Sequence, residues 1–189
     1  MGVRKLAVTE NITLDGVIDA SEGWFVPSGE EEVDQSDLNA ALRVQAAAAD
    51  AVLLGRVTFE EMRGFWPLQT DDQTGVTDYL NNVEKYVVTS TMTEPGWQHS
   101  TVLSGDVEES IRELKGREGK DIVVTGSITL VHELIARGLV DEYRMFVYPV
   151  VIGRGARLFE DATNVGKLRF VDCRPFSSGI VLTRYSTNG

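Results

Sequence analysis

The sequence has little cysteine or histidine, the residues from which disulfide scaffolds and many metal sites are built. Cys173 is the single cysteine, and His99 and His132 are the two histidines. One cysteine cannot form a disulfide within the chain, and so few potential ligands do not suffice for a structural or catalytic zinc site. We therefore expect no metal.

Basic residues and long apolar runs are scarce as well. Lys and Arg total 18 against 29 Asp and Glu, which gives a net charge of −11. A chain this acidic is repelled by nucleic acids and by anionic lipid surfaces. The longest apolar region, residues 46–54, is interrupted by Asp50, and the N-terminus carries no secretion signal. We expect a small-molecule substrate, no nucleic-acid or membrane partner, and a cytoplasmic location.

Features that promote disorder are rare too. The chain has five prolines, no low-complexity tract and 42% hydrophobic residues. At 189 residues it is long enough to bury a substantial core without disulfides. The sequence therefore predicts one folded domain over residues 1–189.

The most informative stretch, residues 121–138, is typical of a strand, a tight turn and a helix. Its first part is apolar and β-branched, which suits a strand of a parallel sheet, and the helical period that follows ends at Gly138. The turn at 125–127 would place free N–H groups and the positive end of a helix dipole at the carboxyl edge of the sheet, where they can bind phosphate. The alternative is an ordinary turn, with Gly126 for geometry and Ser127 as helix N-cap, and the turn taken alone favours that alternative.

The same arrangement occurs twice more along the chain. Apolar strands at residues 51–54 and 86–90 each end in a turn of glycine, serine or threonine. A doubly wound sheet places such turns side by side along its carboxyl edge, where an extended phosphate-bearing ligand lies. Arg56 adds a planar guanidinium group for phosphate recognition, and Thr58 adds a hydroxyl. Together the three turns favour a nucleotide cofactor.

The remaining elements complete an α/β pattern with a mixed sheet, parallel early and antiparallel at its C-terminal end. Further helices are expected at residues 38–49 with Ser36 as N-cap, after Gly55, at 78–83 and at 107–117. Further strands are expected at residues 6–9, 101–103, 141–152, 168–174 and 180–186. The loop at 19–36 carries Trp24 and Phe25, which either anchor it onto the core or form a flap over a pocket.

Motifs of other enzyme classes are absent from the sequence. It contains no GxxxxGK[ST] phosphate-binding loop and no GxSxG nucleophile motif, and neither histidine belongs to a pattern typical of a catalytic triad. The segment at residues 153–158 resembles a truncated GxGxxG motif. It lacks the third glycine and a following helix, so we interpret it as a turn between strands.

Six short motifs follow one another along the chain. They are Leu14-Asp-Gly-Val-Ile18, Leu53-Leu-Gly-Arg-Val-Thr-Phe-Glu60, Tyr86-Val-Val-Thr-Ser-Thr91, Val123-Val-Thr-Gly-Ser127, Leu139-Val-Asp-Glu-Tyr143 and Gly153-Arg-Gly-Ala-Arg-Leu-Phe159. Their order resembles the dihydrofolate reductase-like superfamily. Within it, the chain is similar to the reductase domain of the riboflavin-biosynthesis deaminase-reductase and its stand-alone bacterial relatives, over nearly its whole length.

This resemblance implies a three-layer α/β fold, with a mixed, mainly parallel sheet and an antiparallel C-terminal hairpin. It also implies that NADPH is bound and that its hydride passes to a small heterocyclic or carbonyl substrate. Asp15 is the candidate catalytic residue near the transferred hydride, with a purely structural turn as the alternative. The implied cofactor-binding residues are Gly16, Val17 and Ile18 near the nicotinamide, Gly55, Arg56 and Thr58 at the 2′-phosphate and pyrophosphate, Thr89, Ser90 and Thr91 beside the adenine ribose, and Thr125, Gly126, Ser127, Ile128 and Thr129 at the pyrophosphate.

The chain also departs from the resemblance. Dihydrofolate reductases have two adjacent glycines where this chain has Gly126-Ser127, and a carboxylate on the first helix near the position of Asn39, with Asp37 close by. We therefore do not expect folate reduction. The HxE and PCxxC motifs of the deaminase domain are missing too. Two alternatives to a reductase of unknown substrate remain: a non-catalytic nucleotide-binding module, and a reductase of a ribosylaminopyrimidine intermediate of riboflavin synthesis.

The C-terminal strands predict a homodimer. Residues 143–152 and the hairpin at 168–186 offer more β surface than one layer of helices can cover, and such edges are commonly buried against a second copy. Trp24, Phe65 and Trp66 are candidates for the wall of a substrate site, although each taken singly also fits the core.

Overall fold

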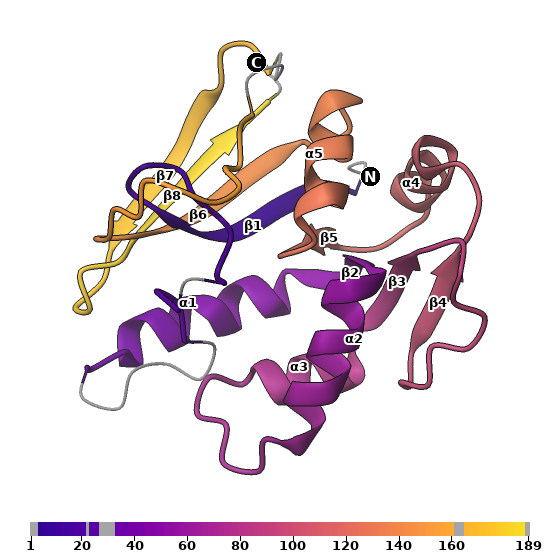
Figure 1. Ribbon diagram of the computed structural model, residues 1–189, viewed down its shortest axis with the longest axis horizontal. Coiled ribbons are helices and arrows are strands. Elements are labelled where there is room, and N and C mark those ends of the chain that lie inside the picture. The colour runs from indigo at the N-terminus through magenta and orange to yellow at the C-terminus, as the bar shows by residue number, and fades with distance from the viewer. Residues whose placement is uncertain (1–3, 22, 27–32, 161–164, 188–189) are drawn as a thin grey trace.

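The protein folds around an eight-stranded sheet, and the computed structural model describes residues 4–21, 23–26, 33–160 and 165–187. The strands follow the order β4-β3-β2-β5-β1-β6-β8-β7 (Figure 1). All pairs from β4 to β6 are parallel, and β6–β8 and β8–β7 are antiparallel, as predicted. The strands are β1 (Leu6–Thr13), β2 (Ala49–Gly55), β3 (Glu84–Val88), β4 (Ser100–Leu103), β5 (Asp121–Val124), β6 (Glu142–Tyr148), β7 (Arg169–Pro175) and β8 (Val181–Ser186).

Helices cover both faces of the sheet, so the fold has three layers (Figure 1). Leu53 of β2 packs in one core cluster with α4 and α5, and its neighbour Val52 packs in another with α2 and α3. Phe146 of β6 packs against α1. The helices are α1 (Ser36–Ala47), α2 (Arg56–Phe65), α3 (Val76–Asn82), α4 (Val107–Gly116), α5 (Ile128–Ala136) and the short 3-10 helix η1 (Trp66–Leu68). No helix in the described part of the chain has the length and apolar character needed to cross a membrane.

Two predicted boundaries were wrong for identifiable reasons. Ser36 is not the N-cap of α1. It is the first helical residue, and the Asp34 carboxylate accepts its N–H at 2.9 Å. β6 ends at Tyr148, well before residue 152, because Pro149 has no N–H to donate to the ladder.

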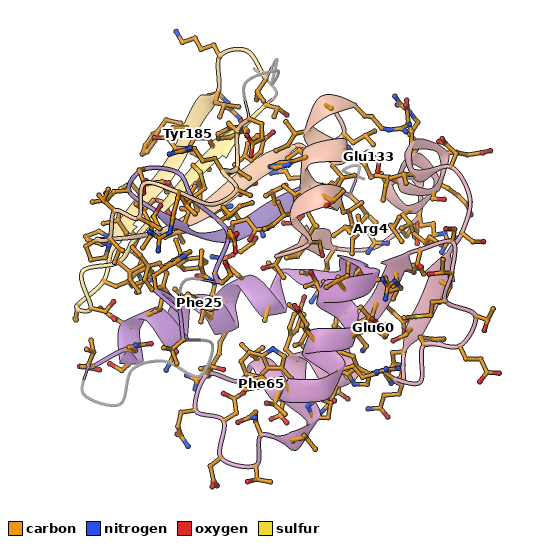
Figure 2. All side chains as sticks on the ribbon, in the orientation of Figure 1. Arg4, Phe25, Glu60, Phe65, Glu133 and Tyr185 are labelled. Carbon is orange, nitrogen blue, oxygen red and sulfur yellow. The ribbon has the colours of Figure 1, made fainter. Side chains whose placement is uncertain are left out.

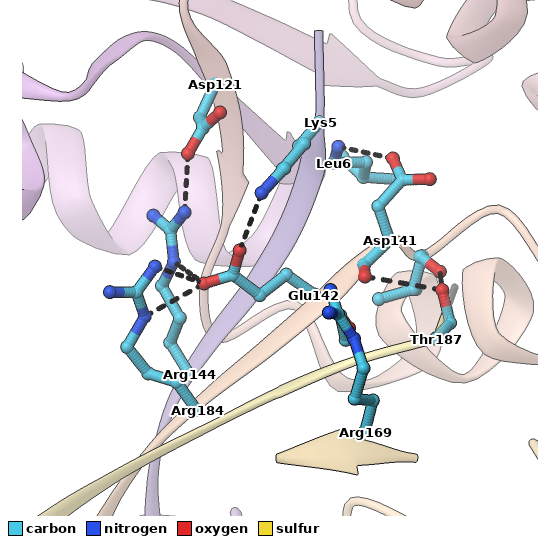
Figure 3. A network of polar contacts seen from close by, with 11 residues as sticks. Lys5, Leu6, Asp121, Asp141, Glu142, Arg144, Arg169, Arg184 and Thr187 are labelled. Atoms are coloured by element: carbon cyan, nitrogen blue, oxygen red, sulfur yellow. Dashed lines mark hydrogen bonds and ion pairs between the residues drawn. The ribbon is translucent and has the colours of Figure 1, made fainter. Parts of the chain in front are cut away.

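A network of charged side chains lies at the amino edge of the sheet, where β5 and β6 begin (Figure 3). Glu142 is 1% exposed and accepts hydrogen bonds from Arg144 at 2.9 Å and from Arg184 at 2.6 Å. Arg144 also pairs with Asp121, and Lys5 reaches the second oxygen of Glu142 at 3.4 Å. Burial alone would raise the pKa of Glu142, but the bonds from Arg144 and Arg184 outweigh it and lower this pKa to about 2. The buried charges of this network are therefore paired.

Candidate functional site

A cavity of about 640 Å³ is lined by strands β1, β2, β5 and β6 on one side and by α1, α2, η1 and α3 on the other. This volume is within the range of small-molecule sites in proteins. Its walls come from segments far apart in the sequence, which the fold of the sheet brings together. Among the described residues, no group of three or more His, Cys, Asp or Glu side chains is placed to hold a metal ion.

Aromatic side chains form much of the cavity wall: Trp24, Phe25, Phe65, Trp66, Phe146 and Tyr148. Figure 2 labels Phe25 beside α1 and Phe65 beside α2 and α3. The rings of Trp24 and Phe25 pack edge-on against Tyr148, at centroid distances of 5.4 and 5.9 Å. The two residues therefore pack onto the end of β6, as the anchor interpretation predicts, and they line the cavity at the same time.

The turns after β2 and β5 lie against one another, as the sequence predicted. Gly55 N–H donates to Ser127 Oγ at 3.0 Å, and Ser127 N–H donates to Thr58 Oγ1 at 2.9 Å. The neighbouring order of β3, β2 and β5 places the third turn beside them. Thr58, Thr125 and Gly126 also line the cavity, so two of the three turns border it.

The backbone geometry and a close contact explain the glycine at position 126, in agreement with the ordinary-turn alternative. Its φ is +57°, and a Cβ there would lie 2.9 Å from Cγ2 of Thr58. Its N–H donates to Glu10 Oε2 at 3.1 Å, and the Ser127 N–H is bound by Thr58. The glycine therefore allows close contact between two turns, and two N–H groups expected for phosphate are used within the protein. Ser127 is in the N-cap position of α5, but its hydroxyl bonds Gly55 and does not cap the helix.

Two helices also begin at this edge, α2 at Arg56 and α5 at Ile128. The first N–H groups of a helix have no acceptor within that helix. Both helices direct the positive ends of their dipoles toward the same edge of the sheet. The Arg56 side chain, 44% exposed, pairs with Glu60 at 2.8 Å, which is the local ion pair that the sequence also allows.

The residues after β3 form a separate surface group. Thr89 N–H donates to the carbonyl of Leu103, and Thr91 N–H donates to Thr89 Oγ1 at 3.2 Å. The hydroxyl oxygens of Thr89 and Thr91 are 3.3 Å apart, and Ser90 is exposed. None of the three lines the cavity. A ligand that extends from the cavity along the carboxyl edge of the sheet would meet these residues only with the end that lies outside the cavity.

Asp15 lies outside the cavity and holds a turn. Its carboxylate accepts bonds from Thr13 Oγ1 at 2.6 Å and from the N–H of Gly153 at 2.7 Å. These bonds, that from Thr13 above all, lower the pKa of Asp15 to about 2. Gly16, with φ of +85°, completes the turn. This geometry supports a structural role for Asp15 in the turn, and we do not count Asp15 among the catalytic residues.

Of the three implied nicotinamide residues, Gly16, Val17 and Ile18, one lines the cavity. Val17 is buried and pairs with Arg157 in an isolated bridge. Ile18 is also buried, and its side chain lines the cavity. The segment therefore meets a ligand through Ile18.

Sequence reasoning missed Glu10, the most unusual residue at this edge. It lies in β1 between Val8 and Ile12, both of them core residues, and is 4% exposed. Oε2 accepts the Gly126 N–H, while Oε1 has no hydrogen-bond partner among the described residues. Burial raises the pKa of Glu10 well above its ordinary 4.5, and the Gly126 bond opposes this only in part. Burial therefore favours the uncharged form of this carboxyl group, which lies at the α5 turn and borders the cavity. The sequence held one signal that could have revealed Glu10, a carboxylate at an inward-facing position of an otherwise apolar strand.

The first helix presents an amide to the cavity, not a carboxylate. Asn39 lines the cavity, and its Oδ1 is buried without a partner among the described residues. Asp37 faces away, because its Oδ2 accepts from Ser177 N–H at 2.8 Å and from Ser177 Oγ at 2.9 Å. The wall formed by α1 thus offers a neutral polar group.

Comparison with known families agrees with this geometry. The family model of the RibD C-terminal domain matches residues 4–182. The chain belongs to this family. An uncharacterised protein of Bacillus subtilis, YyaP, is 32% identical over 190 residues, which cover 98% of this chain and 96% of the relative.

Solved structures identify the fold as that of dihydrofolate reductase. A putative riboflavin biosynthesis protein from Shewanella sp. PV-4 superposes with a TM-score of 0.70 at 20% identity, covering 96% of this chain and 98% of that one. Dihydrofolate reductase from Enterococcus faecalis, complexed with NADP(H), gives 0.63 at 21%, with coverages of 96% and 95%. A deaminase/5-amino-6-(5-phosphoribosylamino)uracil reductase from Thermotoga maritima gives 0.61 at 19%, covering 97% of this chain and 56% of that one. The family and these neighbours together support a reductase-type function.

Proposed function

We propose that the protein is an NADPH-dependent reductase that passes a hydride to a small heterocyclic or carbonyl substrate in the aromatic cavity. The observation that carries this proposal is the position of Thr58, Thr125 and Gly126. All three line the cavity, Thr58 from the first turn of α2 and the other two from the turn that leads into α5. A dinucleotide held at these turns would reach the cavity with its reactive end.

The donors at the carboxyl edge fit a pyrophosphate. The N-termini of α2 and α5 lie at this edge, and the turns that precede them are bonded to each other. The NADP(H) complex of the Enterococcus faecalis enzyme, which has the same fold, supports this choice of cofactor. When bound, NADPH supplies the hydride, and the protein supplies orientation and a dry pocket.

The burial of Glu10 reduces the opposing charge at this edge. A carboxylate bonded to the Gly126 N–H would repel phosphate groups bound at the same turn. Burial raises the pKa of Glu10, which favours the protonated form and weakens that repulsion. Trp24 and Phe25, packed on Tyr148, cover the cavity from the loop side and help to exclude water.

The test is NADPH oxidation, followed by its absorbance, with a panel of pterins, ribosylaminopyrimidines, quinones and aldehydes. We expect oxidation with at least one class of acceptor, and tight NADPH binding by calorimetry. Binding of NADPH without turnover on the whole panel would favour a non-catalytic nucleotide-binding module. Failure to bind NADPH at all would contradict the proposal.

We also propose that the protein is a homodimer through its β7 edge. β7 is the last strand of the sheet and is exposed along its whole length, and Phe170 on it is 60% exposed. An exposed apolar edge strand of this kind is commonly covered by a second copy. Light scattering at micromolar concentration should give a dimer, and a clean 20.8 kDa monomer would contradict this proposal.

A further inference from the structure

The geometry points to a substrate class: we propose that the cavity binds a flat, uncharged heteroaromatic lactam and rejects substrates that carry a phosphate group. A lactam here means a ring N–H beside a ring carbonyl. The proposal deepens the proposed function, because it assumes that the cavity is the substrate site of the reductase.

The cavity concentrates polar groups that lack partners. Among the described residues, seven buried side-chain N or O atoms have no hydrogen-bond partner. Five of them belong to residues that line the cavity: Thr9 Oγ1, Glu10 Oε1, Asn39 Oδ1, Gln45 Nε2 and Tyr79 OH. Buried polar atoms in folded proteins are normally partnered, and leaving one unpaired is costly. Their convergence on one cavity indicates a ligand that completes these bonds.

These atoms define a neutral pattern of donors and acceptors. Asn39 and Gln45 lie on the same helix, and their unpartnered atoms are an acceptor, Asn39 Oδ1, and a donor, Gln45 Nε2. Tyr79 remains a phenol and can donate, because burial raises the pKa of its hydroxyl group. A lactam presents a donor and an acceptor on adjacent ring atoms, which such groups can meet together. The aromatic wall of the cavity suits a flat ring.

The cavity offers little to neutralise a phosphate. Among the described residues, the carboxylic acids and bases that line it are Glu10, Glu61 and one arginine, and burial favours the neutral form of Glu10. The arginine, Arg43, is exposed and donates to the Gln73 carbonyl at 2.6 Å. At the start of α1, where an anion could otherwise meet free N–H groups, the Asp34 and Asp37 carboxylates already accept from Ser36 and Leu38. A phosphate dianion in this cavity would therefore be poorly neutralised.

This places the protein apart from the Thermotoga maritima neighbour, whose substrate is a phosphoribosylamino-uracil. The ring of that compound fits the polar pattern, but its phosphate has no matching cation among the described residues that line the cavity. The chain is thus suited to a ring of the same chemistry without the phosphate.

Riboflavin and FMN test this directly, because they share a flat lactam ring system and differ by one phosphate group. Both are titrated into the cofactor-free protein and followed by quenching of flavin fluorescence. We expect riboflavin to bind in the micromolar range and FMN at least tenfold more weakly. Equal or tighter binding of FMN, or no binding of riboflavin, would overturn the proposal. Riboflavin binding by a protein that fails to bind NADPH would contradict the proposed function alone, and the converse result would contradict this inference alone.

The role of the unpartnered amides is tested by Gln45→Met, which keeps the side-chain length and removes the polar group. If Gln45 is retained for a ligand, the ligand-free variant should melt roughly 2–4 °C higher. Its affinity for riboflavin should fall about fivefold to tenfold. A lower melting temperature with unchanged affinity would show that the amide is structural and overturn this assignment. The control is Gln98→Met, since Gln98 is exposed and bonded to the Asn81 carbonyl, and it should leave riboflavin binding unchanged.

Discussion

The amino edge of the sheet and the cavity both contain buried polar groups, but they differ in how those groups are satisfied. At the amino edge, both oxygens of Glu142 are bonded to cations, and Arg144 pairs with two carboxylates. At the cavity, neutral groups such as Asn39 Oδ1 and Gln45 Nε2 have no partner among the described residues. A network satisfied within the chain stabilises the fold, whereas groups left unsatisfied in a cavity are available to a ligand.

Breaking the network should have the largest effect on stability. Arg144→Met leaves Asp121 and Glu142 without one of their partners, and loss of one member of a buried ion pair costs about 3–5 kcal/mol. We expect the free energy of unfolding in urea to fall by this amount while riboflavin binding is retained. The matched control is Arg112→Met, which breaks an exposed pair with Glu108 and should cost less than about 1 kcal/mol. Similar losses in both variants would remove the distinction between the two regions.

The same network should make stability depend on acid. The pKa of Glu142 is lowered in the folded state to about 2, so its stabilising effect is present above the ordinary value of 4.5. It is lost as the pH falls from 4.5 toward 2. Urea unfolding in this range should show a shallower pH dependence for Glu142→Gln than for the native protein. Identical slopes would show that Glu142 is not held by its arginines.

The contact between the two turns predicts an intermediate effect. Gly126→Ala places a Cβ 2.9 Å from Thr58 at a φ of +57°, whereas Gly138→Ala has a similar φ of +64° and open space. Both variants bear the strain of an alanine in the left-handed region. Gly126→Ala also overpacks the turn, so it should be less stable than Gly138→Ala by about 1–3 kcal/mol. Only Gly126→Ala should also weaken NADPH binding, measured by calorimetry. Equal destabilisation of the two would contradict the close packing of the turns.

Glu10 predicts a smaller effect that appears with rising pH. The pKa of Glu10 is raised in the folded protein, so its protonated form stabilises the fold below 4.5. That contribution is lost as the pH rises from 4.5 toward the folded-state pKa, by at most about 1.4 kcal/mol per pH unit. Glu10→Gln, which cannot ionise, should therefore be more stable than the native protein at pH 8 and similar to it at pH 4. A constant difference across this range would show that Glu10 does not titrate as a buried acid.

The parallel and antiparallel parts of the sheet and the adjacency of the turns followed from the sequence, because apolar β-branched runs and glycine turns are local signals. Gly126 was correctly placed in a tight turn, but the side chain that leaves no room for a Cβ there belongs to Thr58, which is distant in the chain. The sequence left a catalytic and a structural role open for Asp15, since its partner Gly153 lies beyond any local pattern.

Local patterns gave only single candidates for the cavity wall, Trp24, Phe65 and Trp66, and all three line it. They could not show that the Trp24–Phe25 segment, α1 and the Phe65–Trp66 segment meet around one cavity, because these segments come together only in the folded chain. Glu10 was overlooked because a carboxylate in a strand normally faces solvent. The same limit applies to Asn39, whose lack of a partner depends on every group around it.

The central claim, that the edge at α2 and α5 binds NADPH, is tested most directly by the dissociation constants of NADPH and NADH for the native protein and for Arg56→Ala. The ion pair of Arg56 with Glu60 is exposed and contributes under about 1 kcal/mol, so the guanidinium group can readily turn to a ribose phosphate. A charged hydrogen bond of about 1.5–3 kcal/mol predicts that Arg56→Ala weakens NADPH binding roughly 10- to 100-fold and leaves NADH nearly unaffected. Arg112→Ala, which breaks an equivalent exposed pair on α4, should change neither constant. Equal losses for both cofactors in Arg56→Ala, or no loss for either, would contradict the account.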